Sequence, residues 1–131
     1  MATITITLIS GAAENELAEF ALNFGATALK GGHKFNLFLF GNACNLANQE
    51  VPWTGERGMN QELTDFMDTQ RLADKVKDLA AQGAVIHTCH TTEYGRGTEG
   101  CQYIEGVSRG NVGSSLTKFL LTSDAAFTLG G

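Results

Sequence analysis

The chain has 131 residues, a net charge of -5 and three cysteines. At roughly 150 residues per domain, this length predicts a single domain, residues 1–131, which needs no disulfide or metal to fold. The composition, 43% hydrophobic and 18% charged, is that of a globular protein. A pI near 5.0 and scattered Lys and Arg residues argue against a nucleic-acid partner. An odd number of cysteines excludes a closed disulfide framework.

The first expected element is a strand over residues 3–10, where isoleucine alternates with threonine. This pattern disfavours a signal peptide, which would carry a basic segment followed by an unbroken apolar run. Further along the chain, no apolar run approaches the roughly 18 residues that a transmembrane helix requires. We therefore expect a cytoplasmic protein with no membrane contact, in which the thiols are reduced.

Residues 14–30 are predicted to form a helix that ends at Gly31-Gly32. Its buried face is expected to carry the apolar residues at helical spacing, which are Leu17, Ala21, Phe24 and Ala28. Residues 34–40 are almost wholly apolar, which indicates a strand covered on both faces.

Residues 41–58 show no periodicity and are expected to form a long loop. The remaining segments predict helices and strands in turn. The expected elements are a helix over residues 59–81, a strand over 84–89, short helices over 100–107 and 114–122, and a final strand over 125–129.

This alternation of strands and helices predicts a three-layer α/β/α fold with a mostly parallel sheet of four to five strands. In such folds, ligands bind beyond the carboxyl ends of the strands. The segments after Ser10, Phe40 and Cys89 should meet at that edge, which also collects the C-terminal tail and Cys44. No glycine-rich dinucleotide or phosphate-loop pattern is present, so we expect no cofactor.

Cys89 stands at the end of a predicted strand, just before a possible helix start at Thr91 or Thr92. A thiol near a helix N-terminus and near cations is more readily ionised. His90 is adjacent, and Arg96 lies between two glycines that let the backbone bring it close. His87 shares the strand face of Cys89. A thiolate in this setting could attack sulfane sulfur and carry it as a persulfide. The alternative is that Cys89 is an inert buried residue and His90 a solvated one.

The other candidate residues are less defined. Cys101 could reach Cys89 as a resolving thiol or as the partner in a redox switch. Cys44 has no charged residue within five positions and is otherwise unexplained. Trp53 either anchors its loop on the core or contacts a partner. A metal site formed by His87, Cys89, His90 and Cys101 would match no paired zinc-ligand spacing, so we expect no metal.

The segment 83–97, Gly-Ala-Val-Ile-His-Thr-Cys-His-Thr-Thr-Glu-Tyr-Gly-Arg-Gly, resembles the DsrE/TusD-type sulfur-relay family. In that family a strand ends in a cysteine, which Cys89 matches, and an Arg-Gly pair follows at the same spacing. The segments around Gly31-Gly32, residues 41–49 and residues 121–127 also have counterparts. His90 and Thr91 depart from the small apolar residues common there, and cysteine is unusual at the position of Cys44.

The resemblance implies a DsrE-like domain in the cytoplasm. It implies homo-oligomers or assemblies with related subunits. It also implies that the protein is a sulfurtransferase or sulfur-carrier subunit, in which Cys89 accepts sulfur and passes it to small sulfur-carrier proteins. Arg96 and His90 would support the thiolate or bind an anionic donor, and Cys101 and Cys44 are possible accessory thiols. The family also has members without transfer activity. The alternative is therefore a non-catalytic subunit that holds partners through the loop containing Trp53.

Overall fold

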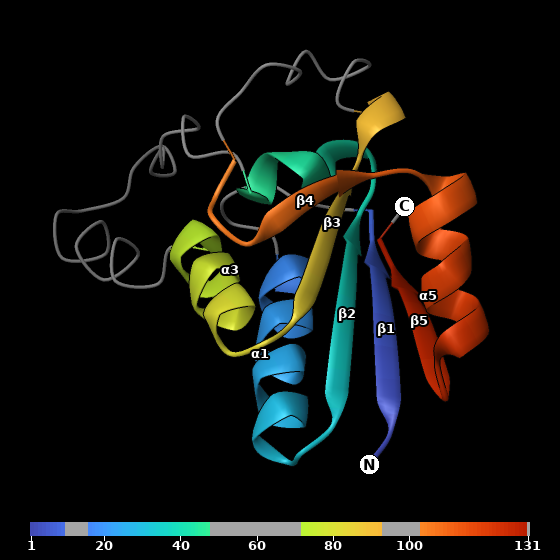
Figure 1. Ribbon diagram of the computed structural model, residues 1–131. Coiled ribbons are helices and arrows are strands. Elements are labelled where there is room, and N and C mark those ends of the chain that lie inside the picture. Colours follow the sequence, from blue (N-terminus) through green and yellow to red (C-terminus); the bar gives the residue numbers. More distant parts are fainter. Residues whose placement is uncertain (10–15, 48–71, 93–102, 131) are drawn as a thin grey trace, which may run out of the picture.

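The computed structural model describes residues 1–9, 16–47, 72–92 and 103–130. Five strands form one sheet in the order β4-β3-β2-β1-β5, and all the neighbouring strands are parallel (Figure 1). The strands are β1 (Thr3–Leu8), β2 (Lys34–Leu39), β3 (Val85–Cys89), β4 (Val107–Gly110) and β5 (Ala125–Leu129).

Helices lie on both faces of the sheet, which confirms the predicted three-layer α/β/α class. They are α1 (Glu16–Lys30), the 3-10 helix η1 (Gly41–Ala47), α3 (Leu72–Ala81), the π-helical segment η2 (Val112–Leu116) and α5 (Thr117–Thr122). The first three pack on one face, and η2 and α5 pack on the other. Within the described ranges, no helix combines the length and the apolar character needed to cross a bilayer.

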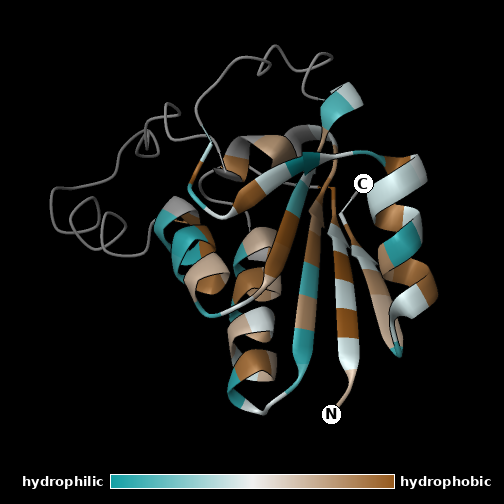
Figure 2. Ribbon diagram, viewed as in Figure 1, coloured by the Kyte–Doolittle hydropathy of each residue, from teal (hydrophilic) through white to brown (hydrophobic). Residues whose placement is uncertain are grey.

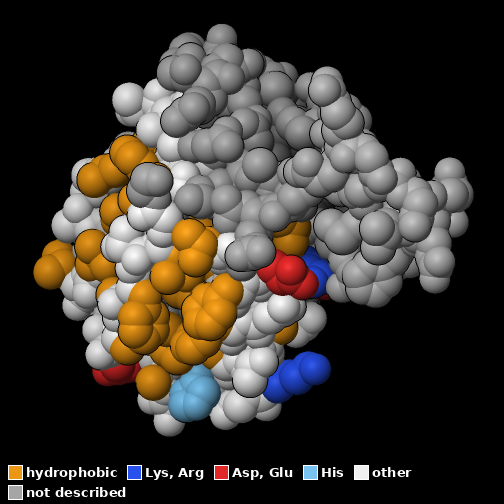
Figure 3. All heavy atoms as spheres, turned by 180° about the vertical axis from the view of Figure 1, so that it is seen from behind, with side chains coloured by type: hydrophobic (Ala, Val, Ile, Leu, Met, Phe, Trp, Pro, Cys, Tyr) orange, Lys and Arg blue, Asp and Glu red, His pale blue; other side chains and the backbone are white. Residues whose placement is uncertain are grey.

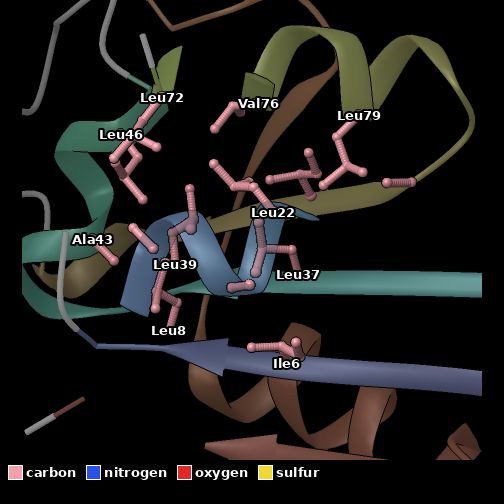
Figure 4. Packing of buried hydrophobic residues seen from close by; sticks show 14 of the residues in the cluster. Ile6, Leu8, Leu22, Leu37, Leu39, Ala43, Leu46, Leu72, Val76 and Leu79 are labelled. Carbon is pink, nitrogen blue, oxygen red and sulfur yellow. The ribbon is translucent and has the colours of Figure 1, made fainter. Parts of the chain in front are cut away.

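The main core lies between the sheet and the α1, η1 and α3 layer (Figure 4). Side chains alternate between the two faces of a strand, so every second residue of β1 and β2 points into this layer. Ile6 and Leu8 do so from β1, and Leu37 and Leu39 from β2. The threonines of β1 face the other way, and the alternation appears as brown and white bands in Figure 2.

Polar side chains line the sheet on the α5 face. Thr5, Thr7 and Asn36 are buried there, and the Asn36 amide donates a hydrogen bond to Thr5 Oγ1 at 3.1 Å. Thr5 Oγ1 also lies 2.5 Å from Ser123 Oγ, which donates to the carbonyl of Phe119. These bonds fix the C-terminal end of α5 to β1.

The buried face of α1 differs from the predicted one. Ala21 and Ala28 are buried as expected, but Leu17 is 40% exposed. The sheet side is made of small residues and one leucine, which are Ala18, Ala21, Leu22, Gly25 and Ala28. A Cβ atom on Gly25 would lie within 2.8 Å of three ring atoms of Phe35. The helix therefore approaches the sheet more closely than a face of large residues would allow.

Two other sequence predictions need correction. Residues 41–47 form η1 rather than open loop. No helix spans residues 103–107, because a turn at Glu105 and Gly106 leads directly into β4. This edge strand has only four residues, and its two central ones are exposed, so it lacks the apolar run that marks a strand. The remainder of the predicted loop, and residues 59–71 of the predicted helix 59–81, lie outside the described ranges.

The close contact at Gly25 gives the first prediction. Gly25→Ala should destabilise the fold by about 1–3 kcal/mol, because the new methyl group overlaps the Phe35 ring in a packed core. Urea denaturation followed by circular dichroism measures the change. The matched control is Gly113→Ala, where the nearest atom to the new Cβ is Asn111 Oδ1 at 3.5 Å. An equal loss in both variants would show that helical glycine itself, and not the Phe35 contact, is responsible.

Candidate functional site: the carboxyl edge around Cys89

Cys89 is the last residue of β3 and lies opposite Gly110 of β4. The chain continues directly into a helical turn at residues 90–92. Its position at the carboxyl edge of a parallel sheet is therefore the one that the sequence predicts. The side chain points to the α5 face and is 1% exposed, in a cluster with Phe38, Phe119, Phe40 and Leu116.

The expected cationic neighbours of Cys89 are only partly described. His90 opens the helical turn and is exposed. Arg96, Cys101 and Trp53 lie outside the described ranges, so their predicted roles stay predictions. Within these ranges, no three His, Cys, Asp or Glu side chains are grouped closely enough to hold a metal ion.

Cys44, which the sequence left unexplained, lies in η1 at the same edge and is fully buried. Its Sγ atom is 3.1 Å from Thr92 Oγ1, 3.6 Å from the carbonyl oxygen of Leu39 and 3.8 Å from that of Cys89. The thiol is therefore held among the ends of β2 and β3, and it contacts the backbone that carries Cys89.

The Thr92 hydroxyl connects these same segments. It donates a hydrogen bond to the carbonyl of Cys89 at 3.1 Å and accepts one from the backbone N–H of Gly41 at 3.2 Å. Gly41 adopts a positive φ of 63°, a conformation that glycine reaches without strain. The turn after β3 is thus tied to the turn after β2, which fixes the backbone around the candidate nucleophile.

His87 lies two residues before Cys89, on the same face of β3. Its Nδ1 atom is 3.0 Å from Ser115 Oγ, and its ring centroid is 5.1 Å from that of Phe119. Burial lowers the pKa of His87 below 6.5, and the positive charge of Lys118 lowers it further. The imidazole is therefore neutral at neutral pH.

Sequence reasoning missed Thr92 as a hydrogen-bonding centre and Ser115 as a partner of His87. Ser115 is separated from His87 by 28 residues, and no local pattern links them. The one available signal was Asn111, which is suited to cap a helix and whose side chain accepts a hydrogen bond from Ser114 N at 2.7 Å. Asn111 marks the start of the helical segment, but it does not indicate which face of that segment lies against His87.

No protein-family model matches the chain, and no curated protein matches it significantly. Solved structures do match the chain. The YchN protein of E. coli is 21% identical, with a TM-score of 0.75 over 98% of this chain and 100% of its own. MTH1491 of Methanobacterium thermoautotrophicum, a protein of unknown function, is 13% identical, with a TM-score of 0.65 over 97% and 99%.

A third similar structure is the conserved protein of unknown function BT1422 of Bacteroides thetaiotaomicron. It is 18% identical, with a TM-score of 0.60 over 98% of this chain and 95% of its own. At these identities the similarity shows a shared α/β/α fold, and it assigns no activity.

The hydrogen bonds of Thr92 give the second prediction. Thr92→Val should cost about 1–3 kcal/mol, since it leaves the buried thiol of Cys44, the Gly41 N–H and the Cys89 carbonyl without this partner. Thermal and urea unfolding measure the loss. Thr91→Val is the matched control, because Thr91 is exposed in the same turn. If the two variants unfold alike, the Thr92 hydroxyl does not stabilise this edge.

Proposed function

We propose that this protein is a cytoplasmic sulfurtransferase or sulfur-carrier subunit of the DsrE type, which accepts sulfane sulfur on Cys89 and passes it to a small carrier protein. The observation that carries the proposal is the place of Cys89, at the end of β3 and directly before a helical turn. The carboxyl edge of a parallel sheet is where ligands bind in open α/β folds. The DsrE-like fold supports the same assignment.

The chemistry requires only the thiol and a donor. The Cys89 thiolate attacks the outer sulfur of a donor R–S–SH, a sulfur–sulfur bond forms at Cys89, and the donor's own sulfur–sulfur bond breaks. The leaving R–S⁻ keeps the electron pair and takes the proton that Cys89 gives up. In the second half, a thiolate of the acceptor attacks the terminal sulfur and regenerates Cys89. Each half exchanges one sulfur–sulfur bond for another, so no external oxidant or reductant is consumed.

His90 and Arg96 take supporting roles in this proposal. His90 directly follows the nucleophile at the exposed start of the helical turn, where a donor would approach the edge. Arg96 would supply the fixed positive charge that an anionic donor such as thiosulfate needs. Cys101 and Cys44 are accessory thiols at most. The three hydrogen-bonding contacts of Cys44 favour a structural role for that residue.

Sulfur loading is the third prediction. After incubation with polysulfide or thiosulfate, wild-type protein should gain the mass of one sulfur atom, mapped to Cys89 by peptide mass spectrometry. Cys89→Ser should gain none. Cys101→Ser is the control for a general loss of thiols and should load like wild type. Undiminished loading of Cys89→Ser would show that the sulfur resides elsewhere.

A specific observation favours assembly with further subunits, which both the transferase and its alternative, a non-catalytic subunit, would show. Phe20 of α1 is 56% exposed and Phe127 of β5 is 48% exposed. Both rings contact Phe24, at centroid distances of 6.1 and 6.0 Å. We call these three residues the α1–β5 patch, and Figure 3 shows the apolar side chains gathered on that face. Since β5 is also an edge strand, this face suits a contact with a second copy or a related subunit.

The fourth prediction concerns assembly. Size-exclusion chromatography with light scattering should give wild-type protein a mass above the 14.0 kDa of one chain. The double variant Phe20→Ser, Phe127→Ser should shift toward the monomer, because it removes the two most exposed rings of the patch. Val112→Ser, on the opposite face, is the control for lost apolar surface and should keep the wild-type mass. A wild-type mass of one chain would contradict assembly through this face.

A further inference from the structure

Cys89 lies beneath the segment formed by η2 and α5. Of the four apolar side chains in its cluster, Phe38 and Phe40 come from β2 and the residue that follows it, whereas Leu116 and Phe119 come from η2 and α5. With Cys89 only 1% exposed, a donor sulfur cannot reach Sγ while all four stay in place. The sheet strand is fixed by pairing on both sides. Among the described residues that cover Cys89, the removable part is therefore the segment that carries Leu116 and Phe119.

One contact joins this segment to the strand of Cys89. His87 Nδ1 and Ser115 Oγ are 3.0 Å apart, and the same imidazole packs against Phe119. The approach depends on Gly110, where a Cβ atom would lie 2.8 Å from Ser115 Cβ and 3.0 Å from His87 Nδ1. The serine therefore reaches the histidine across a gap that any side chain at position 110 would close.

Ser115 Oγ takes part in a second hydrogen bond besides the contact with His87. The backbone N–H of Asn111 donates to Ser115 Oγ at 3.4 Å, so the oxygen already accepts one hydrogen bond. Ser115 Oγ and His87 Nδ1 share one further hydrogen bond, in which either atom donates according to the tautomer of the imidazole.

We infer that His87 and Ser115 form a latch that holds Phe119 over Cys89, and that a sulfur donor reaches the thiol only when the latch opens. The inference rests on the proposed sulfur transfer, since an inert cysteine would need no access. His87 and Ser115 are positioning residues in this scheme, because they act on Cys89 through Phe119.

The charges around His87 make the latch sensitive to pH. Among the described residues, Lys118 of α5 is the charged group that acts on the imidazole. The residues paired with His87 in the sheet, Phe38 of β2 and Ser108 of β4, are uncharged. Protonation of His87 would place a second cation beside Lys118 in a partly buried contact. Because the pKa of His87 lies below 6.5 in the folded protein, the latch is intact above that pH and weakens as the pH falls through this lowered pKa.

Site-resolved alkylation tests the latch directly, and it is the fifth prediction. Iodoacetamide is added to the folded protein, and the rate at each cysteine is followed by peptide mass spectrometry. Ser115→Ala should raise the rate at Cys89 by roughly three- to tenfold, the change expected for one lost hydrogen bond. Cys44, held by Thr92 and not by α5, should keep its rate and serves as the internal control. Ser108→Ala is the matched variant, since Ser108 is an exposed serine beside His87.

The pH dependence separates a latch from general loosening. The ratio of the Ser115→Ala rate to the wild-type rate cancels the ionisation of Cys89 itself. This ratio should be high at neutral pH and approach one below the pKa of His87. Lys118→Gln should move the midpoint to higher pH by removing the repelling charge, and Lys118→Arg should leave it in place. A ratio that does not change with pH would overturn the role of His87.

Phe119→Ala provides a second route if Ser115→Ala folds poorly, and circular dichroism confirms that each variant is folded. Unchanged Cys89 alkylation in both variants would refute the latch, even if the wild-type protein loads sulfur. Faster alkylation in a protein that never loads sulfur would refute the proposed transfer and, with it, the purpose assigned to the latch. Faster alkylation together with faster sulfur loading is the result that the inference requires.

Discussion

The rest of the structure depends on the direction of the connection from β4 to β5, which crosses the sheet from one edge to the other. Connections between parallel strands are right-handed almost without exception. The connections through α1 and α3 step one way along the sheet, from β1 to β2 to β3, whereas the connection through η2 and α5 returns from β4 to β5 at the opposite edge. The returning segment must therefore lie on the other face. Because side chains alternate between the two faces of β3, Ile86 points into the main core, whereas His87 and Cys89 point toward α5.

The small residues on the sheet side of α1 also determine which of its large side chains are exposed. With Gly25 against Phe35, the helix lies close to the sheet, and Leu17 and Phe20 are left exposed. Phe20 then has no core to enter and stacks instead on Phe24, next to the exposed edge of β5. The small residues that let α1 pack tightly on the sheet therefore also leave Phe20 on an exposed apolar surface.

Local sequence patterns predicted the strands β1, β2, β3 and β5, because each is a β-branched or apolar run bounded by glycine or polar residues. They also placed Cys89 at a strand end. They left open whether Cys89 is buried, since the residues that cover it come from β2 and from the η2–α5 segment, which are distant in the sequence. The role of Cys44 was hidden for the same reason, as its partner Thr92 lies 48 residues away. The faces of α1 were misread because spacing identifies apolar positions but does not rank small against large.

The pairing of β1 with β5 has a consequence for how the chain is made. The backbone N–H of Thr3 donates to the carboxylate of Asp124 across 121 positions, so the sheet closes between segments far apart in the sequence. Contacts of such long range slow folding, because the entropy of loop closure must be lost before they form. A nascent chain emerging from the ribosome would hold β1, β2 and β3 well before residues 112–129 are available. Throughout that interval Phe119 does not cover the thiol of Cys89, so this side chain is buried only once the last segment of the chain has packed on the sheet.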